Sequence, residues 1–299
     1  MPSEAHDAIV KMLRAGTSLS PSPDGSTDIE ALRQGMEAMV GAIPAPEGVR
    51  YQPLEAAGVS AEWVDADASD ATKVLLYLHG GGYVIGSIST HRGLVGRIVQ
   101  ASGIRGLSVD YRLGPEHPFP AAVEDAAAVY RFLLAEGIEP SNIAIGGDSA
   151  GGGLTFATLL ALKDAGDPLP GAAIALSPWV DLEGLGESMQ TKADADPMVT
   201  RDGLLMMAGL YLDGADPRHP HAAPLYGDLS GLPPILVQVG TAETLLDDSI
   251  RITERARDAG VAIELQQFED LVHVFQAFAP VPEALDAIEK LGAFLKRHL

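Results

Sequence analysis

The run from Lys73 to Leu78 limits the fold of this chain most, because it is almost entirely apolar. Successive side chains of a strand point to opposite faces, so a strand of this composition must be covered on both sides. Similar short runs lie at 106–111, 142–145, 172–176 and 235–239. Between them, apolar residues recur at helical spacing at about 119–134, 153–163 and 245–256. This alternation predicts an α/β fold with a mostly parallel central sheet flanked by helices.

Two parts of the chain do not follow this alternation. The first, residues 1–45, contains two short amphipathic helices, the second of which starts after Asp28 as N-cap. The other lies between the strands ending near 177 and starting at 235, and it includes a helical segment at 204–212. Because a structureless loop of that length is rare in a compact domain, we expect a cap insertion at about 183–225. The N-terminal helices are expected to join this cap, and residues 46–299 to form the catalytic domain.

The charge and composition exclude several classes of function. The chain has 299 residues and a formal net charge of -21, so its surface repels phosphate backbones and anionic lipids. We therefore expect no nucleic-acid partner and no membrane partner, and no apolar run is long enough to span a bilayer. The absence of cysteine excludes disulfides, thiol nucleophiles and cysteine-bound metals. Since the start of the chain also lacks the pattern of a secretory signal, we expect a cytoplasmic location.

Ser149 is the candidate nucleophile. It lies in Gly147-Asp148-Ser149-Ala150-Gly151, a G-x-S-x-G motif between a predicted strand and a predicted helix. In that context the serine occupies a sharp turn that presents its hydroxyl at the edge of the sheet, near a helix N-terminus. The motif is short, and on its own it also fits a glycine-rich turn that carries a surface serine.

A second motif, His79-Gly80-Gly81-Gly82, directly follows the buried strand. Such glycines allow backbone N–H groups to approach a substrate oxygen closely, as in an oxyanion hole. The alternative is a phosphate-binding loop, but neither G-x-G-x-x-G nor a P-loop motif occurs here. His79 is expected to brace the loop by hydrogen bonds.

A nucleophilic serine needs a base, and the base needs an acid that orients it. His273 fits as the base because it follows the last predicted strand. The other histidines lie near the termini, before the serine, or in a proline-rich segment that holds His219 and His221. The H-x-H spacing of that pair lacks a third ligand, so we predict no metal site. Glu243 follows the strand at 235–239 and is the expected acid, with Asp247 and Asp248 as alternatives.

Taken together, these motifs resemble the bacterial hormone-sensitive-lipase-like carboxylesterases, a branch of the α/β-hydrolase fold. The segments that carry the resemblance are HGGG, GDSAGG, Tyr111-Arg112-Leu113-Gly114-Pro115-Glu116, and the late Glu243 and His273. The resemblance implies hydrolysis of short-acyl-chain esters without a cofactor, through an acyl-enzyme intermediate. It also implies oxyanion-hole donors at Gly81, Gly82 and Ala150. The sequence departs from the family pattern at the acid, which is commonly Asp followed by Pro and here is Glu243-Thr244.

The substrate is expected to be a small-molecule ester bound between the sheet edge and the cap. Tyr83, Asp148 and Trp179 are candidate pocket residues, although Tyr83 and Trp179 also fit ordinary core packing. Val261 to Gln266 alternates as the last strand, which places it at a sheet edge and favours a homodimer. A lactonase or amidase using the same triad and a non-catalytic small-molecule receptor on the same fold are the alternative functions.

Overall fold

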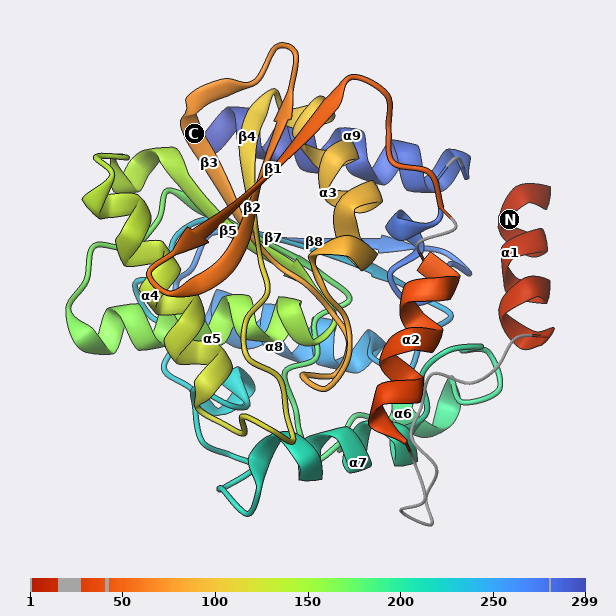
Figure 1. Cartoon of the computed structure of the whole chain (residues 1–299). Coiled ribbons are helices and arrows are strands. Elements are labelled where there is room, and N and C mark those ends of the chain that lie inside the picture. The colour runs from red at the N-terminus through yellow and green to blue at the C-terminus, as the bar shows by residue number, and fades with distance from the viewer. Residues whose placement is uncertain (1, 16–27, 41–42, 280) are drawn as a thin grey trace.

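The computed structural model of the chain describes residues 2–15, 28–40, 43–279 and 281–299. Eight strands form one sheet in the order β1-β2-β4-β3-β5-β6-β7-β8 (Figure 1). They are β1 (Val49–Ala56), β2 (Val59–Ala66), β3 (Asp70–Leu78), β4 (Ile104–Val109), β5 (Ile143–Asp148), β6 (Ala172–Leu176), β7 (Ile235–Gly240) and β8 (Ile263–Phe268). The strands from β4 to β8 pair in parallel, and only β1 and β2 pair antiparallel with their neighbours. The predicted mostly parallel sheet is confirmed.

Helices cover both faces of the sheet (Figure 1). They are α1 (Glu4–Ala15), α2 (Ile29–Val40), α3 (Ile88–Ser102), α4 (Ala121–Ala135), α5 (Ala150–Ala165), α6 (Ser188–Thr191), α7 (Arg201–Leu212), α8 (Leu246–Asp258) and α9 (Pro282–His298). Alternate residues of β3 enter different cores. Leu75 packs with side chains of α3 and α9, whereas Leu76 packs with those of α4, α5 and α8. This explains why the strand is apolar at nearly every position.

Two features went unpredicted, the β1–β2 hairpin and α3. The hairpin has a mixed pattern of burial, and Pro53 lies within its edge strand β1. Helix α3 contains Gly93 and Gly96, which lower helix propensity. Gly96 lies where a Cβ would collide with the Tyr51 hydroxyl and Pro46. Close packing, and not propensity, therefore accounts for this helix.

Helix α2 is drawn beside α6 and α7, and α1 lies farther out on the same side of the molecule (Figure 1). Arg14 at the end of α1 donates to Asp194 O at 2.8 Å and to Ala195 O at 3.2 Å, in the segment between α6 and α7. Asp28 accepts a hydrogen bond from Ala31 N at 3.1 Å, which confirms it as the N-cap of α2. Arg33 of α2 donates to Val84 O at 3.0 Å and Gly114 O at 3.1 Å, and it pairs with Glu116 at 2.7 Å. Helix α2 is thus bonded both to the segment that follows the HGGG motif and to the loop after β4. Residues 16–27 and 41–42 of the predicted N-terminal cap lie outside the described residues.

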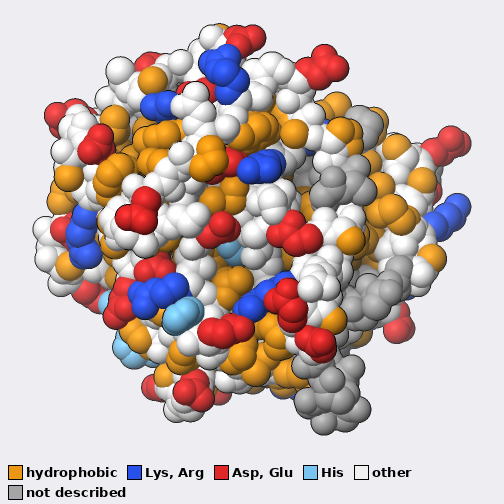
Figure 2. Space-filling view, viewed as in Figure 1, with side chains coloured by type: hydrophobic (Ala, Val, Ile, Leu, Met, Phe, Trp, Pro, Cys, Tyr) orange, Lys and Arg blue, Asp and Glu red, His pale blue; other side chains and the backbone are white. Residues whose placement is uncertain are grey.

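Acidic residues outnumber basic ones by 41 to 20, and on the face shown in Figure 2 they are spread among basic ones without forming a single patch. Among the described residues, none of the helices combines the length and apolar composition that crossing a bilayer requires.

Candidate active site

Ser149 lies between β5 and α5 with φ of 53° and ψ of -119°, a conformation that non-glycine residues rarely adopt. The turn is held by backbone bonds from Ser149 N to Leu176 O at 2.8 Å and from Trp179 N to Ser149 O at 2.9 Å. A Cβ at Gly151 would collide with the carbonyl of Leu78, so a glycine is required at that position of the motif. The predicted strand–turn–helix context of the serine is therefore present.

The loop predicted to supply the oxyanion donors, residues 79–82, is called the oxyanion loop below and follows β3 directly. Gly81 and Gly82 have φ of 118° and 61°, and both line the same cavity as Ser149. The carbonyl of His79 accepts a hydrogen bond from the Tyr111 hydroxyl at 2.6 Å, and the two rings stack with centroids 4.3 Å apart. His79 thus braces the loop. Ala150 is the first residue of α5, so its N–H is at the helix N-terminus next to Ser149.

His273 and Glu243 form a buried pair. The Nδ1 atom of His273 lies 2.7 Å from Oε2 of Glu243. The other carboxylate oxygen, Oε1, accepts from Gly240 N at 2.7 Å and from the Ser177 hydroxyl at 2.9 Å. Because Glu243 occupies Nδ1, the Nε2 atom of His273 is the nitrogen that is left for a substrate or a nucleophile.

The charge of Glu243 sets the titration of this pair. Burial alone would lower the pKa of His273, but the hydrogen bond and the charge of Glu243 raise it above its ordinary value. Burial raises the pKa of Glu243, against the opposing effect of the His273 hydrogen bond. The carboxylate therefore stabilises the imidazolium form of His273.

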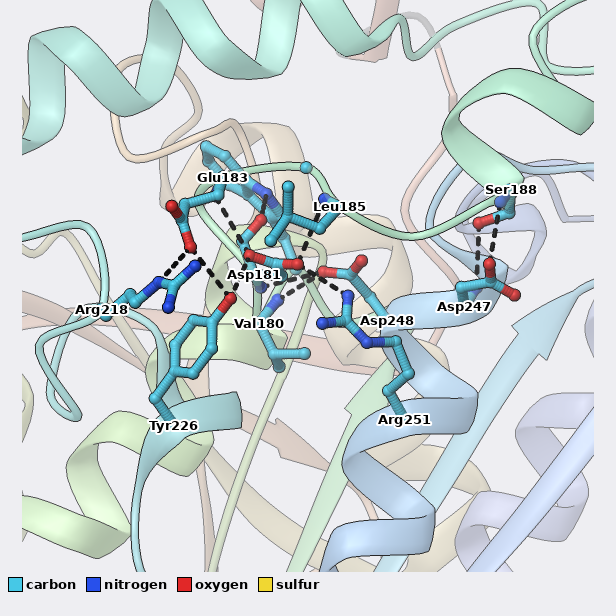
Figure 3. Close-up of polar contacts among 12 residues, drawn as sticks. Val180, Asp181, Glu183, Leu185, Ser188, Arg218, Tyr226, Asp247, Asp248 and Arg251 are labelled. Atoms are coloured by element: carbon cyan, nitrogen blue, oxygen red, sulfur yellow. Dashed lines mark hydrogen bonds and ion pairs between the residues drawn. The ribbon is translucent and has the colours of Figure 1, made fainter.

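The two alternative acids bind other groups (Figure 3). Asp247 accepts from Ser188 N at 2.8 Å and so binds the start of α6. Asp248 accepts from Val180 N at 2.9 Å and from Asp181 N at 3.0 Å, and both aspartates point toward the segment after β6. Neither bonds to His273, whose carboxylate partner among the described residues is Glu243.

A cavity of about 1150 Å³ opens above Ser149 and His273. Its lining is mostly apolar. It includes Leu32 and Met36 of α2, Met198 just before α7, and Leu204 and Met207 of α7. Of the three candidate pocket residues, Asp148 lines this cavity, whereas Tyr83 and Trp179 are not among its lining residues. Both are buried in the core, where Tyr83 stacks on Tyr211 with centroids 3.9 Å apart.

The sequence and the structure of this chain are similar to those of known proteins of one family. A family model described as alpha/beta hydrolase fold matches residues 75–277. An acetyl-hydrolase from Streptomyces hygroscopicus is 47% identical over 79% of each chain, and an esterase from Acinetobacter venetianus is 38% identical over 88% of each chain. A crystal structure of an esterase from the bacterial hormone-sensitive lipase family matches with a TM-score of 0.95 and 48% identity. That match covers 100% of this chain and 99% of the other.

The chain belongs to the bacterial hormone-sensitive lipase family. This confirms the α/β-hydrolase fold and the prediction of an enzyme that hydrolyses carboxylic esters, because the relatives are esterases and acetyl-hydrolases.

Sequence reasoning missed three polar residues of this hydrolase site. Ser177 bridges Glu243 and the His273 loop, since its hydroxyl also accepts from Val274 N at 3.2 Å. His91 and Tyr77 contact Asp148 beneath the oxyanion loop. Tyr77 stood inside a run that indicated only a strand. His91 and Ser177 matched no motif, because their partners are 57 and 66 residues away in the sequence.

Proposed function

We propose that this protein hydrolyses short-acyl esters through an acyl-enzyme on Ser149. The observation that carries the proposal is the meeting of Ser149, His273 and the oxyanion loop at one cavity, with Nδ1 of His273 held by Glu243. These are the groups that a nucleophilic serine hydrolase requires.

In the proposed reaction, Ser149 Oγ attacks the ester carbonyl while His273 Nε2 takes the serine proton. Glu243 holds the imidazole in the tautomer that leaves Nε2 free, and it stabilises the imidazolium that forms. The N–H groups of Gly81, Gly82 and Ala150 are the proposed donors to the oxyanion. His273 then gives its proton to the leaving alcohol, and a water molecule repeats the sequence on the acyl-enzyme.

The preference for short acyl groups is supported by relatives that are named acetyl-hydrolases. The cavity is larger than a short ester needs, since typical ligand pockets measure roughly 300–1,000 Å³. We therefore propose a substrate with a small acyl half and a larger apolar alcohol half. Helices α1 and α2 and the segment 183–225 are the proposed cap, because Leu13, Leu32 and Leu204 contribute apolar lining to the cavity that Ser149 borders.

The test is turnover of p-nitrophenyl esters by the wild type and by Ser149→Ala. We expect the highest kcat/KM for acyl chains of about two to six carbons and background activity for the variant. A folded Ser149→Ala with wild-type turnover would contradict the mechanism. A matched set of acetate esters with growing alcohols tests the alcohol half, and a parallel set of lactones and amides tests the alternative reactions. A preference for emulsified long-chain triglycerides would contradict the proposed acyl preference.

We also propose a homodimer through β8. This strand lies at the edge of the sheet, where unpaired backbone groups invite pairing. Glu264 and the net charge of -21 oppose close approach of two copies. Light scattering at micromolar protein concentration measures the molar mass in solution, and the mass of a monomer would contradict the proposed dimer. The cytoplasmic location stays a prediction.

A further inference from the structure

A second buried pair lies beneath the oxyanion loop and has no role in the mechanism above. Asp148, the last residue of β5, precedes Ser149, and its Oδ2 lies 3.2 Å from Nε2 of His91 on α3. The side chains of Asp148 and His91 are only 5% and 7% exposed, yet both border the cavity. An acidic group is thus placed beside the site where the substrate oxygen gains negative charge.

The contacts of Asp148 are those of an ionised carboxylate. Oδ1 accepts from the Tyr77 hydroxyl at 2.8 Å and from Gly80 N at 3.1 Å, while Oδ2 faces His91. Burial would raise the pKa of Asp148, but the charge of His91 and the hydrogen bonds with His91 and Tyr77 lower it overall. A Cβ at Gly80 would collide with Oδ2, so the carboxylate packs directly against the first glycine of the loop.

The contacts of His91 are those of an imidazolium. Nδ1 lies 2.8 Å from Thr90 Oγ1 and 3.2 Å from Ser87 O, and the Thr90 hydroxyl itself donates to Ser87 O. Nδ1 therefore faces two acceptors and Nε2 faces a carboxylate, so each nitrogen needs a proton. Gly80 N also directs its hydrogen toward Nε2 at 3.3 Å, but its bond to Asp148 Oδ1 is shorter, at 3.1 Å. We therefore assign the Gly80 hydrogen to Oδ1 and a proton to Nε2, which faces Oδ2 at 3.2 Å.

The groups around His91 leave Asp148 as its principal counter-charge. They are His79 with ring centroids 5.5 Å away, Tyr77 at 6.4 Å, and Glu37 of α2, which bonds to the Ser87 hydroxyl near the start of α3. Burial, followed by the nearby charge of His91, lowers the pKa of His79 to about 3, so that ring is neutral. Burial would lower the pKa of His91 as well, but the charge of Asp148 raises it overall.

We propose that His91 is a positioning residue for ester hydrolysis, which as an imidazolium neutralises Asp148 and through it fixes Gly80 and the oxyanion loop. The inference rests on the proposed role of Gly81 and Gly82 as oxyanion donors. Preorganised donors are effective only when they keep their geometry and when no uncompensated like charge lies nearby. Loss of the His91 proton at alkaline pH would leave a buried carboxylate opposing the oxyanion.

The experiment measures kcat and KM for p-nitrophenyl acetate between pH 5 and 10. It compares the wild type, His91→Gln, Asp148→Asn and the double variant, each checked for folding by circular dichroism. We expect an alkaline decline of kcat in the wild type that is absent in both single variants. His91→Gln should lose about 10- to 100-fold in kcat with little change in KM. The double variant should recover part of that loss, because removing the carboxylate removes the repulsion.

His298→Gln, at the end of α9, is the matched control and should keep the wild-type profile. An alkaline decline that persists in His91→Gln, or variant effects that simply add, would overturn the proposal, since a purely structural role predicts additivity. The titration of the His91 Cε1–H resonance in labelled protein needs no turnover. Its midpoint should lie above that of a free histidine and fall in Asp148→Asn. An inactive wild type with this titration intact would contradict the proposed function, whereas an unshifted titration contradicts the His91 pair itself.

Discussion

The hydroxyl of Ser177 donates a hydrogen bond to Glu243 Oε1 at 2.9 Å and accepts one from Val274 N at 3.2 Å. It thereby connects the carboxylate that follows β7 with the loop that carries His273. Ser177 has φ of 45°, and Ser177 N is held by Gln238 O at 2.7 Å. The distance between the proposed acid and the proposed base therefore depends on Ser177, which follows a third strand, β6.

Removing this hydroxyl should slow the reaction without weakening substrate binding. Ser177→Ala leaves Gly240 N as the remaining contact of Oε1. A hydrogen bond to a charged group is worth about 1.5–3 kcal/mol, so we expect kcat to fall roughly 10- to 100-fold at unchanged KM. Steady-state kinetics on one ester measure this. Ser249→Ala, which removes a buried hydroxyl bonded to Leu245 O on α8, is the control and should keep full activity.

Glu243→Gln should be far more damaging than Asp247→Asn. The amide keeps the shape of Glu243 but removes the charge that favours the imidazolium, and a loss of about 10⁴ in kcat is known for such a change in a serine protease triad. Because the charge of Glu243 raises the pKa of His273 against the effect of burial, the acid limb of kcat/KM should move to lower pH in the variant. Asp247→Asn should change both quantities little. The reverse order of damage would show that the acid is assigned wrongly.

The two glycines proposed as oxyanion donors should differ in their tolerance of a methyl group. At Gly81, φ is 118° and a Cβ would collide with the carbonyl of Ile85, which belongs to the backbone. At Gly82, φ is 61° and the Cβ would meet the flexible side chain of Met207. We expect Gly81→Ala to abolish turnover and Gly82→Ala to reduce it less. Met207→Ala should restore part of the activity of Gly82→Ala and none of that of Gly81→Ala, as measured by kcat/KM.

Asp248 should make the stability of the fold depend on pH. Burial, with the charge of Asp181 adding to it, raises the pKa of Asp248 to about 7. A carboxyl whose pKa is higher in the folded chain binds its proton more tightly there, so its contribution is complete below the unfolded value near 3.8 and is lost as the pH rises to about 7.

Asp248→Asn cannot ionise, and with its amide oxygen in the place of Oδ2 it can still accept the bonds from Val180 N and Asp181 N. As the pH rises from 4 to 8, the wild type should therefore lose free energy of unfolding relative to the variant, on the order of a few kcal/mol. Thermal unfolding at both pH values measures the difference. Asp247→Asn serves as the control, and equal pH dependence of Asp248→Asn and the wild type would rule out the argument.

The part of the fold that the sequence predicted is the part that local patterns determine. Continuous apolar runs marked the buried strands, and helical spacing marked α4, α5, α7, α8 and α9. Helix α3 was not predicted because its glycines lower helix propensity, and Gly96 is explained only by the close packing of Tyr51 and Pro46 against the helix. In the candidate site, short local motifs indicated Ser149 and the oxyanion loop, and the order of residues along the chain indicated Glu243 and His273. Ser177 and His91 matter through partners distant in sequence, so no local pattern could reveal them.

The bonds of Arg33 have a consequence for engineering. A chimera that takes α2 from a relative exchanges part of the cavity lining, but it also exchanges the cation that binds Val84 O, Gly114 O and Glu116. If the donated helix lacks arginine at this position, the segment after the oxyanion loop loses its support. Substrate range and catalytic rate would then change together. A graft of this helix can separate the two properties only if it carries Arg33 and keeps Glu116 opposite.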